Sequence, residues 1–139
     1  MLINEILTIY ELLDRPGKPG KDIADLFAKE GQKVKVQKIT GEKGSTEFVK
    51  IVVEGKKKNG PTLGIIGRLG GIGARPSQIG FVSDGDGALT ALSVALKLVR
   101  MKKRGDELDS TIIISTHVCT NAPTEPHEPV PFMDSPVDI

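Results

Sequence analysis

Residues 61–104 read PTLGIIGRLGGIGARPSQIGFVSDGDGALTALSVALKLVRMKKR, and their features follow an order typical of α/β proteins. An apolar segment from Thr62 to Ile66 predicts a strand. A glycine-rich loop follows, and Asp84 and Asp86 then precede a long amphipathic helix. Because α/β proteins place their chemistry where a buried strand runs into a loop and a helix, we expect the functional site here.

The flanking sequence predicts the remaining elements of an α/β domain. Apolar residues at helical spacing predict helices near residues 2–13 and 23–30, and two strands near 34–39 and 48–53 suit a hairpin. Thr111 to Ser115 predicts a second buried strand, parallel to Thr62–Ile66. Since Thr62–Ile66 is apolar on both sides of its alternation, we expect it at the centre of a mixed sheet, covered on both faces.

Composition restricts the class of protein. The chain has 139 residues, a net charge of +1 and interspersed acids and bases, which gives no electrostatic reason to expect nucleic acid or an anionic membrane as partner. Cys119 is its one cysteine, so an internal disulfide is excluded and a cytoplasmic location is expected. The N-terminus does not resemble a signal peptide, and no apolar run has the length of a membrane span.

The end of the chain predicts that the domain is incomplete. Residues 120–139 are proline-rich and extended, and no closing element follows them. We therefore expect residues 1–139 to form a single α/β domain that is an N-terminal fragment of a longer protein. An incomplete sheet would leave an edge open, through which a homo-oligomer could form.

Chemically useful side chains follow both parallel strands. Ligand sites in such folds lie beyond the carboxyl ends of the strands, where residues 67–86 and 116–128 arrive. The chain's two histidines, His117 and His127, are both in these segments. Carboxylate and imidazole groups suit divalent metals, so the sequence predicts zinc, manganese or cobalt held by a set of four residues: Asp84, Asp86, His117 and His127.

Three residues of these segments also have a simpler interpretation. Asp86 could serve as the N-cap of the following helix. Cys119 could be a nucleophile if His117 or His127 lowered the pKa of its thiol, although a lone cysteine after a buried strand is more often a packing residue. His127, among prolines, could be a surface residue.

The glycine loop has two interpretations as well. It could hold an anionic group of a small-molecule substrate, using Gly70 and Gly71 with Arg68 or Arg75. Alternatively, the glycines could allow close passage of a neighbouring loop. The spacing fits neither a dinucleotide-binding fingerprint nor a phosphate loop.

The chain closely resembles the domain-of-unknown-function family 1177. The matching blocks are GEKGSTEFVKI (41–51), PTLGIIGRLGGIGARP (61–76), GFVSDGDGALTAL (80–92) and THVCTNAPTEPHEPVPFMDSPVD (116–138). The resemblance covers essentially the whole chain. It implies a longer protein and supplies no activity.

A remote resemblance is to the zinc-dependent exopeptidases, the aminopeptidase and carboxypeptidase/deacylase superfamily. It implies a three-layer, phosphorylase/hydrolase-like fold with Asp84 at the position that bridges two metals. Arg68 stands where that superfamily has a metal histidine, and Gly70 stands where it has an aspartate. The glutamate pair expected after the second strand is replaced by residues that include His117 and Cys119.

Three functions follow from these observations. The first is a metal-dependent hydrolase of small amide or peptide-like substrates, in which Arg68 or Arg75 would bind a substrate carboxylate. The second is a metal-free protein that binds an anionic small molecule. The third is a thiol enzyme that uses Cys119 and His117.

Overall fold

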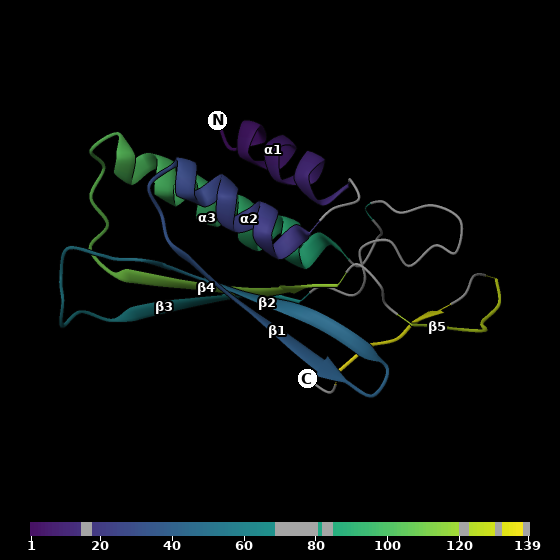
Figure 1. Cartoon of the computed structure of the whole chain (residues 1–139). Helices are drawn as coiled ribbons and strands as arrows, with labels where there is room; N and C mark the ends of the chain where they lie inside the picture. The colour runs from purple at the N-terminus through teal and green to yellow at the C-terminus, as the bar shows by residue number, and fades with distance from the viewer. Residues whose placement is uncertain (15–17, 69–80, 82–84, 120–122, 130–131, 138–139) are drawn as a thin grey trace.

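A computed structural model of the chain describes residues 1–14, 18–68, 81, 85–119, 123–129 and 132–137 (Figure 1). The element order is α1 (Ile3–Leu13), α2 (Pro19–Lys29), β1 (Val34–Gly41), β2 (Gly44–Val53), β3 (Thr62–Gly67), α3 (Asp86–Lys103), β4 (Thr111–Val118), β5 (Thr124–Glu125) and β6 (Phe132–Met133). This is the mixed α/β architecture that the sequence predicts.

The main sheet has the strand order β1-β2-β4-β3. β1 pairs antiparallel with β2, β2 antiparallel with β4, and β3 parallel with β4. All three helices lie on the same side of this sheet, with α2 and α3 against its face and α1 packed on α3 (Figure 1). We call the other side, which no described helix covers, the open face. A second small sheet joins β5 and β6.

The expected place of Thr62–Ile66 is wrong for the part of the chain that the structure describes. β4 is central, because it pairs with both β2 and β3, whereas β3 is at the edge. Ile66 is 85% exposed on the open face, so the strand is not covered on both sides. The sequences of β3 and β4 are similarly apolar, so periodicity alone cannot tell which strand is central. That depends on which of the two strands pairs with β2.

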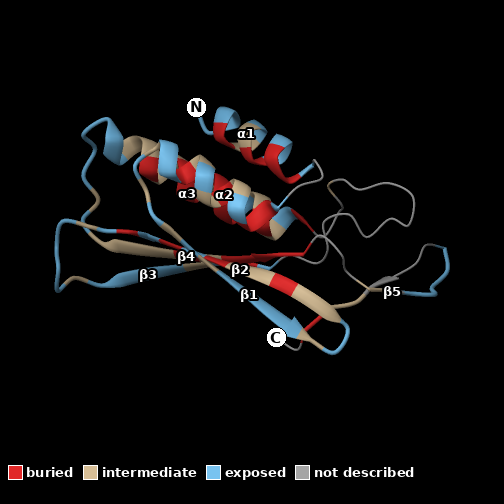
Figure 2. Cartoon of the chain, viewed as in Figure 1, coloured by how far each residue is buried: buried red, intermediate tan, exposed pale blue. Residues whose placement is uncertain are grey.

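The hydrophobic core lies between the helices and the sheet (Figure 2). Alternate residues of β2 point into it, so Val49, Ile51 and Val53 are fully buried while Val52 is partly exposed. The helices contribute apolar stripes, and the buried set from all elements is almost entirely aliphatic. It comprises Ile9, Leu12, Leu13, Ile23, Phe27, Val49, Ile51, Val53, Ala88, Ala91, Leu92, Ala95, Leu96, Val99, Ile114 and Val118.

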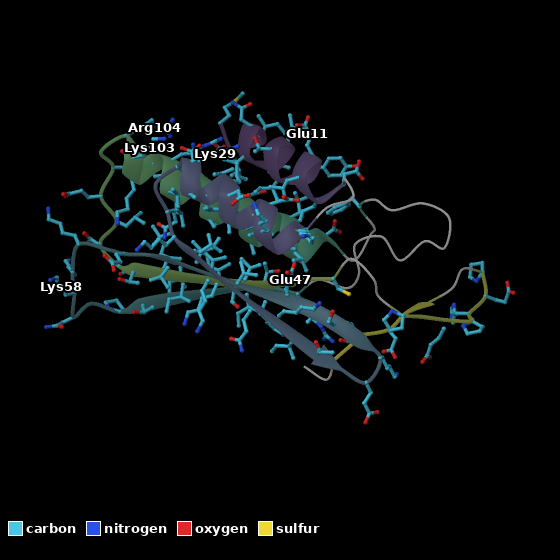
Figure 3. All side chains as sticks on the ribbon, in the orientation of Figure 1. Glu11, Lys29, Glu47, Lys58, Lys103 and Arg104 are labelled. Carbon is cyan, nitrogen blue, oxygen red and sulfur yellow. The ribbon has the colours of Figure 1, made fainter. Side chains whose placement is uncertain are left out.

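Helix ends follow the expected signals. Gly31 after α2 and Gly105 after α3 have φ values of +83° and +97°, the left-handed conformation that glycine adopts at low cost. Glu47 of β2 accepts a hydrogen bond from the Gly20 backbone N–H, 3.0 Å away, in the first turn of α2 (Figure 3). A carboxylate at that helix end is favoured by the helix dipole. None of the helices among the described residues is long and apolar enough to cross a membrane.

An ion-pair network joins the three helices. Arg100 of α3 donates to Glu5 of α1 (3.1 Å) and to Glu30 at the end of α2 (2.9 Å), and Lys103 also contacts Glu30. Burial alone would raise the pKa of Glu5, but the hydrogen bond from Arg100 and nearby positive charge lower it overall. The network therefore fixes the helical layer while keeping its buried carboxylate ionised.

Two glycines allow the end of β3 to touch the start of α3. A Cβ atom at Gly67 would lie 2.0 Å from the carbonyl oxygen of Gly87, and one at Gly87 would lie 1.8 Å from that of Arg68. Both distances are far below any real contact between such atoms. Gly67 and Gly87 thus allow a close approach of two backbone segments. The loop glycines Gly70 and Gly71, for which two interpretations were given, lie outside the described residues.

This contact predicts a stability difference between two glycine variants. Gly87→Ala should lower the free energy of unfolding by more than about 2 kcal/mol, because the added carbon overlaps backbone atoms that cannot move aside independently. Gly64→Ala is the matched control, since a Cβ there meets nothing within 4 Å. It should change stability by less than about 0.5 kcal/mol. Urea unfolding measures both, and equal effects would contradict the close contact.

Candidate functional site

The candidate site lies at the edge of the sheet where β3 and β4 end. Their parallel register ends with Gly67 opposite Thr116, and the Thr116 hydroxyl donates to the Gly67 carbonyl over 2.7 Å. The next residues are Arg68 after Gly67 and His117 after Thr116. Because successive residues of a strand alternate between faces, His117 turns to the open face, on the same side as its partner Phe48.

His117 is buried, and two residues of β2, Thr46 and Phe48, contact its imidazole ring. His117 is only 5% exposed, and its Nδ1 atom lies 3.1 Å from the Thr46 hydroxyl oxygen. Its ring stacks on Phe48, with a centroid distance of 5.4 Å and an interplanar angle of 27°. The other ring nitrogen, Nε2, is buried and has no hydrogen-bond partner among the described residues. A buried polar atom without a partner calls for an explanation, and a bound ligand is one.

The charge state of His117 follows from these surroundings. Burial lowers the pKa of the imidazole, and the positive charge of Arg68 lowers it further. The ring is therefore neutral at pH 7 and stays neutral somewhat below its ordinary value of 6.5. A neutral imidazole can bind a metal or accept a proton, whereas a protonated one can do neither.

Asp86 approaches the same edge from the helical side of the sheet. It is the first residue of α3 and is exposed, while the N-cap position is occupied by Gly85 and has no side-chain capping bond. The alternative role of Asp86 as an N-cap is therefore not realised. Within the described part of the chain, no three His, Cys, Asp or Glu residues form a group that could hold a metal ion.

The other predicted site residues have different surroundings. Cys119 is 1% exposed and its thiol donates to the Ser45 carbonyl over 3.4 Å, which favours a packing role. His127 is exposed between β5 and β6. Arg68 is exposed at the edge of the sheet. The remaining predictions lie outside the described residues: Gly70, Gly71, Arg75 and Asp84.

Sequence reasoning missed Thr46 and Phe48, the two residues that hold the imidazole. Both belong to β2 and lie 71 and 69 positions before His117. The available signal was weak: a threonine and a phenylalanine two residues apart share one face of a strand. Only the pairing of β2 with β4 brings these two side chains against the imidazole.

The two ring nitrogens of His117 have different surroundings. Nδ1 contacts the Thr46 hydroxyl, whereas the buried Nε2 has no partner among the described residues. Metal-binding histidines commonly have the ring nitrogen that does not bind the metal hydrogen-bonded in this way. The adjacent positive charge of Arg68 instead suits an anionic group of a ligand. This edge therefore fits a ligand with two kinds of group. A cation or an N–H group would suit His117 Nε2, and an anionic group would suit Arg68.

A family model matches residues 37–139, which is most of the chain and includes β2, β3, α3 and β4. Its description is "Protein of unknown function (DUF1177)". The chain belongs to the DUF1177 family. No curated protein matches this DUF1177 chain.

Among solved structures, the DUF1177 chain is similar to leucyl aminopeptidase from Leishmania major in complex with actinonin. The similarity has a TM-score of 0.51 at 11% sequence identity, and it covers 86% of this chain but only 28% of the aminopeptidase chain. At this identity the likeness supports a shared fold. The DUF1177 chain thus corresponds to about a quarter of the structure that it matches.

The electrostatic coupling at this site predicts a pKa change in the metal-free protein. Arg68→Ala should raise the pKa of His117 toward 6.5, because it removes the nearby positive charge. NMR titration of the imidazole, with chelator present, measures this. The control is Lys58→Ala, which removes one positive charge from the β2–β3 connection (Figure 3) and should leave the His117 pKa unchanged.

The same shift has a defined sign for stability. The unfolded chain binds a proton at His117 below pH 6.5, while the folded chain resists it, so His117 lowers stability as the pH falls below 6.5 and has no effect above it. Finding that His117 titrates at or above 6.5, or that Arg68→Ala leaves its pKa in place, would contradict the described environment.

Proposed function

We propose that this protein is a hydrolase of small amide or peptide-like substrates, with its site at the carboxyl ends of β3 and β4. The observation that carries the proposal is His117 Nε2, a buried nitrogen of a neutral imidazole that has no partner among the described residues. A buried polar atom without a partner costs free energy, and a functional role is one accepted reason for its retention. The aminopeptidase-like fold supports the same class of reaction.

In this proposal His117 Nε2 would hold a divalent metal ion together with Asp84, which lies outside the described residues. Asp86 and His127 are the further ligands that the sequence predicts, but with His117 alone they do not form a metal-binding group in the part of the chain that the structure describes. When bound, such an ion supplies a Lewis acid that polarises the scissile carbonyl and lowers the pKa of a water molecule. His117 is suited to its part because Thr46 and Phe48 fix its ring before any ligand arrives. This pre-organisation removes an entropic cost of binding.

Arg68 would select the substrate. Its guanidinium is exposed beside the imidazole, so it could bind a carboxylate through two parallel hydrogen bonds. An amide substrate would then carry a free carboxylate close to the bond that is cleaved. N-acyl amino acids and short peptides with a free C-terminus have this arrangement.

A second function is favoured by one specific observation. The described residues hold no three-residue metal group, whereas a positive charge does lie at the site. A metal-free protein that binds an anionic small molecule would need Arg68 and a hydrogen-bond acceptor such as His117 Nε2, and no metal. The two functions share a site and differ in whether an ion completes it.

Metal analysis of the protein purified without chelator distinguishes them. The hydrolase proposal predicts about one zinc, manganese or cobalt ion per chain, lost in His117→Ala and Asp84→Ala. Asp106→Ala is the control, because this exposed aspartate follows the opposite end of α3 and should leave the metal content unchanged. Circular dichroism confirms that each variant is folded.

Hydrolysis assays complete the test. N-acyl amino acids with a free carboxylate should be cleaved, and their methyl esters, which cannot pair with Arg68, should be cleaved at least 100-fold less efficiently. If no ion binds even after zinc, manganese and cobalt are added, and no substrate is cleaved, the hydrolase proposal is wrong. Carboxylate binding that depends on Arg68 would then support the second function.

A further inference from the structure

The hydroxyl of Thr46 makes two close contacts but has only one hydrogen atom. Its oxygen lies 3.0 Å from the carbonyl oxygen of Val118 and 3.1 Å from His117 Nδ1, and both contacts are buried. A carbonyl oxygen can only accept a hydrogen bond. If the hydroxyl hydrogen points to Val118, then Nδ1 must carry a proton and donate it to the Thr46 oxygen.

The alternative arrangement leaves groups without partners. If Nε2 carried the proton, Nδ1 would accept the Thr46 hydrogen and the contact with the Val118 carbonyl would be lost. A buried Nε2–H would also have no acceptor among the described residues. Orphaned buried N–H groups are rarer than under-satisfied acceptors, so the hydrogen-bond network favours the proton on Nδ1.

We propose that Thr46 is a positioning residue that fixes His117 as the Nδ1–H tautomer, so that Nε2 presents a lone pair to the ligand of the site. This is the less common tautomer of histidine in water, so the protein must impose it. The stacked Phe48 ring restricts rotation of the imidazole and holds the same nitrogen against Thr46. The identity of the ligand rests on the proposed function, whereas the tautomer does not.

NMR of the metal-free full chain labelled with [15N]histidine tests the tautomer directly at pH 7.5. The chain has only two histidines, so His127→Asn assigns the signals. We expect His117 to show a protonated Nδ1 and an unprotonated Nε2. Thr46→Val keeps the shape of the side chain without its hydroxyl and should shift the population toward Nε2–H. Thr46→Ser restores the hydroxyl and should restore the original tautomer.

Several outcomes would overturn the inference. A wild-type His117 that carries its proton on Nε2 contradicts it, and so does a Thr46→Val variant that keeps the Nδ1–H tautomer. If Thr46→Val does not fold, the wild-type and Thr46→Ser spectra still decide, because both must show Nδ1–H.

Zinc titration separates this inference from the proposed function. Thr46→Val should bind zinc about 10–100-fold more weakly than wild type, the usual effect of removing a group that orients a metal ligand, and Thr46→Ser should bind it normally. If wild type shows the Nδ1–H tautomer but binds no zinc, the positioning role of Thr46 is confirmed and the hydrolase proposal is weakened. If wild type binds zinc normally but shows the Nε2–H tautomer, the hydrolase proposal is supported and the positioning role of Thr46 is wrong.

Discussion

The simultaneous pairing of β4 with two strands determines the rest of the structure. Its antiparallel register with β2 sets His117 opposite Phe48, and its parallel register with β3 sets Thr116 opposite Gly67. The first register brings side chains of β2 against the imidazole. The second brings Arg68 to the same edge of the sheet. A slip by one residue would turn His117 into the helical layer, so the site exists only in this register.

The glycine contact between β3 and α3 adds the third component of that edge. Without side chains at Gly67 and Gly87, the first turn of α3 can rest on the backbone at the end of β3. Asp86 is thereby placed beside the carboxyl ends of the strands. The helical face of the sheet supplies an aspartate, and the open face supplies a histidine and an arginine. Any ligand common to these groups must lie beyond the ends of the strands, where α/β sheets generally bind their ligands.

Much of the fold could be predicted from local sequence signals. Helical spacing and strand-forming residues report on local backbone preference, and the helices and strands predicted from them are confirmed. Gly31 and Gly105 end two of these helices in the left-handed conformation that glycine favours. The strand order was not predictable in the same way. β4 also continues to Val118 rather than stopping at Ser115, because the polar side chains of Thr116 and His117 find partners in Gly67 and Thr46. Those partners are distant in sequence.

The position of His117 and Arg68 on the sheet could be predicted, but the contacts of the imidazole could not. His117 and Arg68 could be assigned to one edge because both follow parallel strands. The role of Thr46 depends on a contact across 71 residues, and a threonine at the start of a hairpin strand gives no sign of it. Equally, nothing in the residues around Cys119 reveals that its thiol donates a hydrogen bond to the Ser45 carbonyl.

The proposed function depends on His117 Nε2 being the atom that meets the ligand. The most direct test is a crystal structure of the full chain grown with zinc, with anomalous data collected at the zinc edge. We expect an anomalous peak about 2.0–2.1 Å from His117 Nε2, the ordinary zinc–nitrogen distance. A zinc peak elsewhere in the protein, with Nε2 still lacking any partner, would contradict it.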